Sequence, residues 1–207
     1  MKVRKIKIIS VDFQKEFVSK KGKWFNFGKS ISFVKKILIP YLIKNKLKVS
    51  EIISDYRQPR PGDEGDGCYP GTENYKSDIP LSVKSEDVWI KCMNSPIWIR
   101  KNIGKKRKPG LPYQDPKKFA KWLNKNIGKP SEISYVVLIG LTIDYCVFSA
   151  AQELSWRGYK VKILEEATDV SGGSINYKKQ LVKKSPLLNW AEIISWKELI
   201  KDLEKIK

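Results

Sequence analysis

The chain has 207 residues, 41% of them hydrophobic, which suits one packed globular domain. No apolar run approaches the ~18–20 residues of a membrane-spanning helix. The first residues also lack the apolar core and cleavage site of a signal peptide, so we expect a cytoplasmic protein without membrane contact. The absence of histidine excludes Ser-His and Cys-His catalysis, and three widely spaced cysteines argue against a disulfide framework.

The formal net charge is +19, which raises the possibility of a nucleic acid or another anionic partner. Lysines are scattered over nearly every segment, often near acidic residues, so a generally Lys-rich surface is the simpler interpretation. Such a surface, rich in isoleucine as well, is also typical of a thermophilic origin. We therefore expect a small-molecule substrate, with a nucleic-acid partner as the less favoured alternative.

The hydrophobic pattern predicts strands that alternate with helices along the whole chain. The continuous apolar run at 135–140 is typical of a central parallel strand covered on both faces. The other strands are predicted at 5–12, 50–54, 86–91, 159–164 and 192–195, and helices at 30–46, up to about 126, 144–157, 174–184 and 196–205. This alternation predicts a single domain over residues 1–207, with a mostly parallel sheet in three layers.

Two segments interrupt the pattern. Residues 57–82 are rich in Pro, Gly and acidic residues and show no period, so we expect a long functional loop. Residues 100–118 form a basic insertion, which together with Arg57 and Arg60 could bind an anionic substrate group, although a solvated charged surface is the alternative. Four aromatic residues could line a pocket or belong to the core: Trp24, Phe25, Tyr56 and Trp98.

Three reactive residues lie at the carboxyl ends of predicted strands, where parallel sheets bind ligands: Asp12, Lys91 and Cys146. Cys146 falls in the first turn of a helix that Thr142 or Asp144 could cap, and a helix N-terminus stabilises a thiolate and an oxyanion. Asp12 could take the thiol proton, and Lys91 could lower the thiol pKa. Each residue alone also fits a structural role, as a buried cysteine, a turn residue or a solvated lysine, so the hypothesis depends on all three together.

Four motifs at these positions match a known family. They are D-x-Q at Asp12–Gln14, a lysine with a serine four residues on at Lys91 and Ser95, G-x-x-x-D-x-C-V from Gly140 to Val147, and Gly158–Val161 followed by Glu166-Ala167. Over about residues 5–200 the chain resembles the isochorismatase-like cysteine hydrolases, which include nicotinamidases and N-carbamoylsarcosine amidohydrolases.

The resemblance implies a doubly wound α/β/α sandwich and a homodimer or homotetramer. It implies that small amide, carbamoyl or ureido C–N bonds are hydrolysed through a covalent acyl-enzyme, without a cofactor. The implied triad is Asp12, Lys91 and Cys146. The implied oxyanion hole is the backbone N–H groups of Thr142 and Cys146, with a cis peptide bond between Leu141 and Thr142. The implied substrate-binding residues are Gln14 and Ser95, and we add Arg57 because of its charge, not because of the resemblance.

One departure concerns a metal. Nicotinamidases carry a metal-binding D-x-H motif after the second strand, and the corresponding residues here are Asp55-Tyr56-Arg57. Because the chain has no histidine, the resemblance predicts that this metal site is missing, so nicotinamide is not the expected substrate. A catalytically silent relative, or a basic protein that binds an anionic partner such as nucleic acid, remains the alternative.

Overall fold

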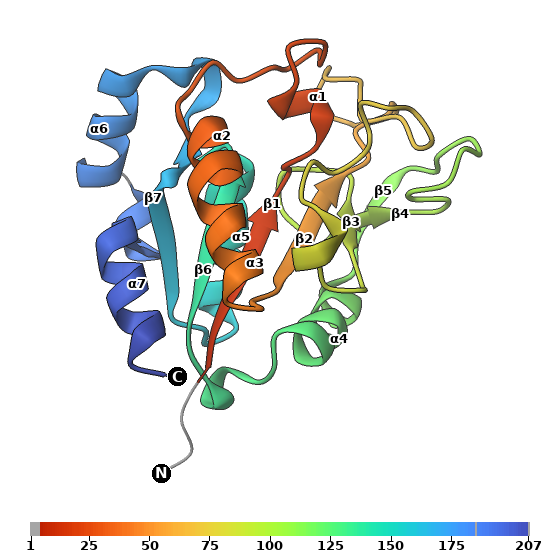
Figure 1. Cartoon of the computed structure of the whole chain (residues 1–207). Helices are drawn as coiled ribbons and strands as arrows, with labels where there is room; N and C mark the ends of the chain where they lie inside the picture. The colour runs from red at the N-terminus through yellow and green to blue at the C-terminus, as the bar shows by residue number, and fades with distance from the viewer. Residues whose placement is uncertain (1–4, 185, 207) are drawn as a thin grey trace.

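The computed structural model describes residues 5–184 and 186–206, and its centre is a six-stranded sheet in which all neighbouring strands are parallel (Figure 1). The strand order is β3-β2-β1-β6-β7-β8. The strands are β1 (Lys5–Val11), β2 (Val49–Ser54), β3 (Trp89–Lys91), β6 (Ile133–Leu141), β7 (Val161–Asp169) and β8 (Glu192–Ile194). The first strand, β1, lies in the middle of the sheet. Strands β2 and β3 extend the sheet on one side of it, and β6, β7 and β8 extend it on the other, which confirms the doubly wound topology.

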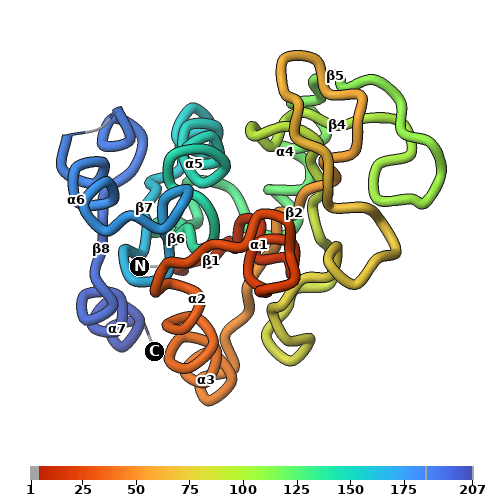
Figure 2. Tube along the Cα trace, turned by 90° about the horizontal axis from the view of Figure 1, so that it is seen from above, coloured from red at the N-terminus to blue at the C-terminus, as the bar shows by residue number. Residues whose placement is uncertain are grey.

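Helices cover both faces of this sheet, as Figure 2 shows. The helices α4 (Pro116–Asn126) and α5 (Cys146–Trp156) lie on one face, and α2 (Ser30–Phe33), α3 (Ile39–Lys44) and α7 (Trp196–Glu204) on the other. Strand β6 serves both cores, because Val136 and Leu138 pack into one and Val137 and Ile139 into the other. The three-layer sandwich predicted from the sequence is therefore confirmed.

The predicted helix at 30–46 forms as three consecutive pieces. A π-helical turn (Val34–Leu38) connects α2 and α3, and Pro40 lies in the first turn of α3. Proline has no backbone N–H and cannot donate the i→i−4 hydrogen bond of an α-helix. The helix accommodates it with a wider π-helical turn just before Pro40. The remaining helices are α1 (Lys15–Val18), α6 (Ile175–Lys184) and the 3₁₀ turns Leu81–Val83, Pro130–Glu132, Ser171–Gly173 and Pro186–Asn189.

The basic insertion is more regular than predicted. It contains most of an antiparallel hairpin of β4 (Trp98–Arg100) and β5 (Pro112–Gln114), and α4 begins within it at Pro116. The long loop at 57–82 is largely irregular, as predicted, and isolated bridges from Tyr56 to Gly67 and from Gln14 to Ser77 attach it to the domain. Within the described residues, no helix is long and apolar enough to cross a membrane.

Candidate active site

The ends of three elements bring Asp12, Lys91 and Cys146 together. Asp12 follows β1 directly, Lys91 ends β3, and Cys146 begins α5 after β6. All three side chains are buried. The Lys91 ammonium nitrogen lies 2.8 Å from Asp12 Oδ2 and 3.4 Å from Cys146 Sγ. Lys91 is therefore not a solvated lysine, and the sheet edge places the three predicted residues in one cluster.

A close approach of β1 and β6 shapes this edge. Gly140 has a φ of 110°, and a Cβ atom there would lie 2.0 Å from the carbonyl oxygen of Val11. Only glycine allows the two backbones to come so close. Asp12, the next residue after Val11, has a φ of 53°, a left-handed conformation in which its carboxylate reaches Lys91.

Two backbone N–H groups beside Cys146 are free. The peptide bond between Leu141 and Thr142 is cis, as the resemblance implies. Within the described part of the chain, the N–H groups of Thr142 and Cys146 meet no acceptor, whereas the neighbouring Ile143 N–H donates to Asp169 O at 2.9 Å. These two groups can stabilise an oxyanion near the sulfur.

The expected side-chain cap of α5 is absent from the described structure. The residue before the helix is Tyr145, and no side chain caps the first turn. Asp144 instead accepts a hydrogen bond from the Ser171 N–H at 3.0 Å, and the Thr142 carbonyl, not its side chain, accepts from the N–H groups of Tyr145 and Val147. The prediction of a Thr142 or Asp144 cap is therefore wrong, and the N-terminus of α5 stays open toward Cys146.

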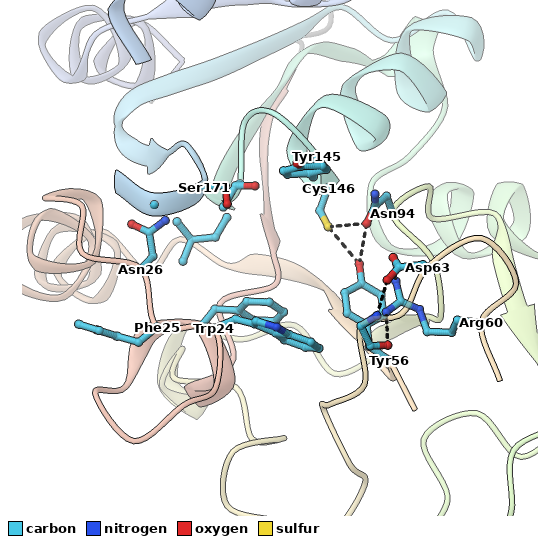
Figure 3. Close-up of a pocket in the computed structure, with 15 residues that line it drawn as sticks. Trp24, Phe25, Asn26, Tyr56, Arg60, Asp63, Asn94, Tyr145, Cys146 and Ser171 are labelled. Atoms are coloured by element: carbon cyan, nitrogen blue, oxygen red, sulfur yellow. Dashed lines mark hydrogen bonds and ion pairs between the residues drawn. The ribbon is translucent and has the colours of Figure 1, made fainter. Parts of the chain in front are cut away.

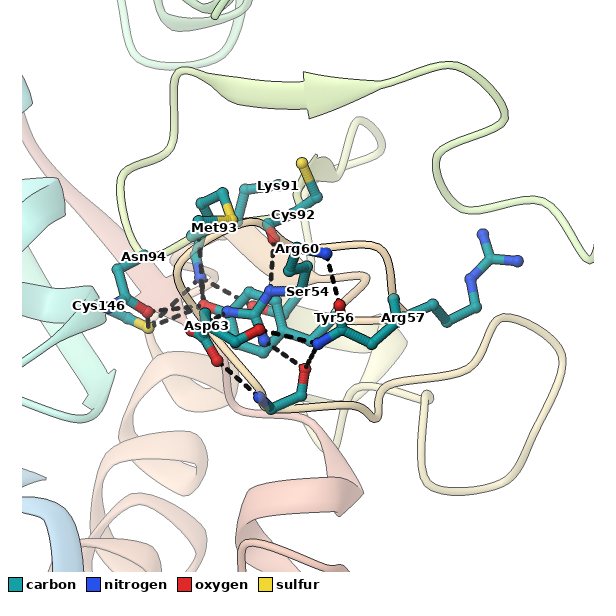
Figure 4. A network of polar contacts seen from close by, with 12 residues as sticks. Ser54, Tyr56, Arg57, Arg60, Asp63, Lys91, Cys92, Met93, Asn94 and Cys146 are labelled. Carbon is teal, nitrogen blue, oxygen red and sulfur yellow. Dashed lines mark hydrogen bonds and ion pairs between the residues drawn. The ribbon is translucent and has the colours of Figure 1, made fainter. Parts of the chain in front are cut away.

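Ser54, which the sequence analysis did not assign, and Tyr56, which it named only as a possible pocket or core residue, complete the cluster (Figure 4). The Ser54 hydroxyl donates to Asp12 Oδ1 at 2.7 Å and lies 2.8 Å from the Lys91 nitrogen. The Tyr56 hydroxyl contacts the Lys91 nitrogen and lies 3.0 Å from Cys146 Sγ. Both residues stand at the carboxyl end of β2, so the rule that located the triad could also have pointed to them.

Burial dominates the electrostatics of the cluster. It raises the pKa of the Cys146 thiol to about 12, with Asp12 adding to the rise, while Lys91 and the Tyr56 hydroxyl act against it. For Lys91, burial lowers the pKa, but the charges of Asp12 and Cys146 outweigh it and leave the pKa raised. Burial thus favours the neutral thiol beside a charged Lys91, whereas the helix N-terminus favours a thiolate.

A cavity of about 230 Å³ opens above the sulfur (Figure 3). Trp24, Phe25 and Tyr56 line it, as expected, whereas Trp98 in β4 does not. Phe17 stacks on Trp24 with ring centroids 5.6 Å apart. The residues around the cavity are Phe17, Trp24, Phe25, Asn26, Tyr56, Arg60, Asp63, Gly65, Asn94, Leu141, Thr142, Tyr145, Cys146, Ser171 and Gly172. Five of these fifteen residues are aromatic, and the start of the long loop supplies three others.

Gln14 and Ser95 do not line this cavity. The Gln14 amide donates to Ser54 O at 3.1 Å and to Tyr75 O at 2.9 Å, and it accepts from Ser54 N–H at 2.7 Å. Ser95 donates to Glu153 Oε1 at 3.3 Å. Expected as substrate-binding residues, both instead satisfy internal groups, and Gln14 holds Ser54 in position.

Arg57 is also turned away from the cavity. Its guanidinium donates to both oxygens of Asp55, each at 2.7 Å, and to Arg107 O at 2.8 Å. Arg60 does line the cavity, but it pairs with Asp63 and donates to Cys92 O at 3.0 Å. Each arginine is therefore neutralised by a carboxylate of its own, and the anion site predicted from Arg57, Arg60 and the basic insertion gains no support from these contacts.

Comparisons with known proteins support the fold of the chain. No protein-family model matches the sequence, and no curated protein matches it either. Solved structures do match. An isochorismatase family protein from Desulfovibrio vulgaris superposes with a TM-score of 0.65 at 12% identity, covering 97% of this chain and 99% of that one. The chain has the isochorismatase-like fold.

Two further structures with this fold carry more specific names. N-carbamoylsarcosine amidase from Thermoplasma acidophilum matches with a TM-score of 0.60 at 19% identity, covering 92% of this chain and 96% of that one. Pyrazinamidase of Pyrococcus horikoshii in complex with zinc matches with a TM-score of 0.63 at 16% identity, covering 93% of this chain and 99% of that one. The resemblance inferred from the sequence motifs is thus confirmed at the level of the fold.

A zinc ion would not fit at the corresponding residues of this isochorismatase-like chain. Both oxygens of Asp55 are occupied by the Arg57 guanidinium, and Oδ2 also accepts from Gly104 N–H at 2.9 Å. The chain has no histidine, and over residues 5–184 and 186–206 no group of three or more Cys, Asp or Glu side chains could hold a metal. Arg57 therefore places a fixed cation where a metal ligand would be needed.

Proposed function

We propose that this chain is a hydrolase of small amide, carbamoyl or ureido compounds, with Cys146 as its nucleophile. The observation that carries the proposal is the setting of the Cys146 sulfur. It lies in the cavity between the buried Lys91–Asp12 pair and two free backbone N–H groups. Nucleophile, base and oxyanion donors thus surround one point where a carbonyl carbon can sit.

In the proposed reaction, the Cys146 sulfur attacks the carbonyl carbon while its proton passes to the Asp12 carboxylate. The carbonyl electrons move to oxygen, where the Thr142 and Cys146 N–H groups stabilise the charge. The amine leaves with the proton from Asp12. Water, deprotonated by Asp12, then releases the acyl group and restores the thiol.

Internal transfer of the proton to Asp12 follows from the raised thiol pKa. Losing the proton to solvent would leave two buried negative charges beside the single charge of Lys91. Transfer to Asp12 leaves one thiolate paired with one ammonium, so the charge of the cluster does not change. Lys91 then stabilises whichever of the two groups is negative.

The cavity supports a small substrate with an apolar or planar part. Its volume of about 230 Å³ is below the common range for drug-sized ligands, and aromatic side chains form much of its wall. The amidase and the pyrazinamidase of similar fold support an amide or carbamoyl substrate. An anionic group on the substrate, expected from Arg57, gains no support from the internal pairing of that residue.

The experiment that tests this proposal is a screen of small primary amides, carbamoyl and ureido compounds for release of ammonia or amine. Cys146→Ala is expected to lower turnover of any substrate found by about 10⁴-fold or more, because it removes the nucleophile. Circular dichroism should show an unchanged fold. Turnover that survives in Cys146→Ala would exclude the nucleophile assignment.

A further inference from the structure

The Tyr56 hydroxyl lies at the contact between the cation and the sulfur of the site. The side chain is buried, and its oxygen contacts the Lys91 nitrogen and lies 3.0 Å from Cys146 Sγ (Figure 4). Its other polar neighbours are the oxygens of Met93 and Asn94, each 3.4 Å away. The proposed hydrolysis does not use this hydroxyl. Yet it lies closer to the Cys146 sulfur than the Lys91 nitrogen, at 3.4 Å, or the Asn94 side-chain oxygen, at 3.6 Å.

Counting protons gives the direction of these hydrogen bonds. The Lys91 ammonium has three protons, and its three shortest contacts are Asp12, Ser54 and Tyr56, while Cys146 Sγ is farther away at 3.4 Å. The Ser54 oxygen donates its own proton to Asp12, so it accepts from Lys91. Tyr56 oxygen likewise accepts from Lys91, and its single proton is then available to its nearest acceptor, the sulfur.

The surroundings of the ring keep the hydroxyl in place as a donor. Arg60 lies over the ring face, 3.9 Å from its centroid, and Trp24 packs against it at 6.0 Å. A cation on the ring face withdraws electron density and strengthens the O–H as a donor. Burial, together with the charges of Cys146 and Asp12, raises the pKa of Tyr56 well above its usual range, so the hydroxyl keeps its proton at neutral pH.

We propose that Tyr56 is a catalytic residue that donates a hydrogen bond to the Cys146 sulfur and carries the effect of the Lys91 charge to it. This inference rests on the proposed function. As the S–C bond forms, the thiol proton passes to Asp12, and Tyr56 stabilises the negative sulfur without losing its own proton. Once the S–C bond has formed in the tetrahedral intermediate, the sulfur is no longer negative and accepts only weakly, so the hydrogen bond does not oppose the departure of the amine that follows.

The test compares Tyr56→Phe with wild type by iodoacetamide labelling of Cys146, followed against pH by peptide mass spectrometry. Phenylalanine keeps the ring contacts and removes only the donor. We expect labelling at a fixed pH to slow by about 10- to 100-fold, the range for a hydrogen bond to a charged group, with an upward shift of the apparent pKa. Tyr75→Phe is the matched control, because the Tyr75 hydroxyl is buried, has no hydrogen-bond partner among the described residues and should not affect Cys146.

A second variant tests the opposite direction. Replacing Tyr56 by 3-fluorotyrosine makes the phenol a stronger donor and is expected to lower the apparent pKa of Cys146. Unchanged labelling in both variants would overturn the role of Tyr56, as would an equal loss in Tyr75→Phe. Because labelling needs no substrate, it is independent of the amide screen: failure of the screen would count against the proposed function, and failure of the Tyr56 shift against this inference alone.

Discussion

Asp12 and Lys91 act on the Cys146 sulfur in opposite directions. The carboxylate raises the thiol pKa and the ammonium lowers it, against a background of burial that raises it to about 12. The pKa of an unfolded cysteine is ~8.5, so the raised pKa of Cys146 adds to the free energy of unfolding at any pH below about 8.5. This contribution is lost as the pH rises from there toward 12. At neutral pH the sulfur therefore depends on its neighbours to become a nucleophile.

Replacing either neighbour should separate sulfur reactivity from hydrolysis. Asp12→Asn removes a negative charge beside the sulfur, so the thiolate forms more readily, but no group remains to protonate the leaving amine. Lys91→Met removes the charge that stabilises the thiolate and leaves Asp12 buried without a cation. Hydrolysis should be lost in both variants, whereas sulfur reactivity should rise in the first and fall in the second.

At the level of elements, the junction of β1 and β6 is the most restricted part of the fold. Gly140→Ala would place a methyl group 2.0 Å from Val11 O at a φ of 110°, and should lower the free energy of unfolding by about 4 kcal/mol or more. Gly158→Ala is the control, because its φ is also positive, at 82°, but the nearest atom would be 3.9 Å away. That control should cost about 1–2 kcal/mol.

Urea unfolding of the two variants measures both values. Equal losses of stability in Gly140→Ala and Gly158→Ala would mean that the close approach of β1 and β6 does not limit the fold. Gly140→Ala should also impair the site, because Asp12 directly follows Val11, the residue that the added methyl group would displace.

The main elements could be predicted because their apolar patterns are long enough to read. All six strands of the sheet fall within a few residues of their predicted positions, since alternation or a continuous apolar run marks each one. The helix α1 and the strands β4 and β5 have four, three and three residues, too few for a period to appear. The hairpin therefore could not be separated from the basic insertion.

The site could be predicted only in part, for a different reason. Strand ends and a helix start located Asp12, Lys91 and Cys146, because backbone topology alone brings such positions together. The partners of Gln14, Arg57 and Ser95 depend on side-chain packing, which the sequence does not show. Arg57 pairs with Asp55 only two residues away, and a basic side chain that is neutralised locally looks the same in the sequence as one that faces a ligand.

At the scale of the whole molecule, the net charge of +19 could attract nucleic acid, so nucleic-acid binding is the alternative to test. Several basic residues are paired with acidic ones, among them Arg57, Arg60 and Lys91. We expect weak association with a labelled 20-nucleotide RNA at low salt that is lost as salt rises from about 50 to 200 mM. Fluorescence anisotropy measures this, and tight binding that persists at about 150 mM salt would favour the binding alternative.

The homodimer or homotetramer implied by the resemblance stays a prediction.

The measurement that tests the central claim most directly is the rate of iodoacetamide labelling of Cys146 at neutral pH in wild type, Asp12→Asn and Lys91→Met. We expect Asp12→Asn to label fastest and Lys91→Met slowest, each differing from wild type by about tenfold or more, the effect of one pKa unit. Cys68 and Cys92 should stay unlabelled in all three, because both are fully buried and, unlike Cys146, neither lines the cavity. Equal rates in the three proteins would contradict the claim that the Lys91–Asp12 pair controls a nucleophilic Cys146.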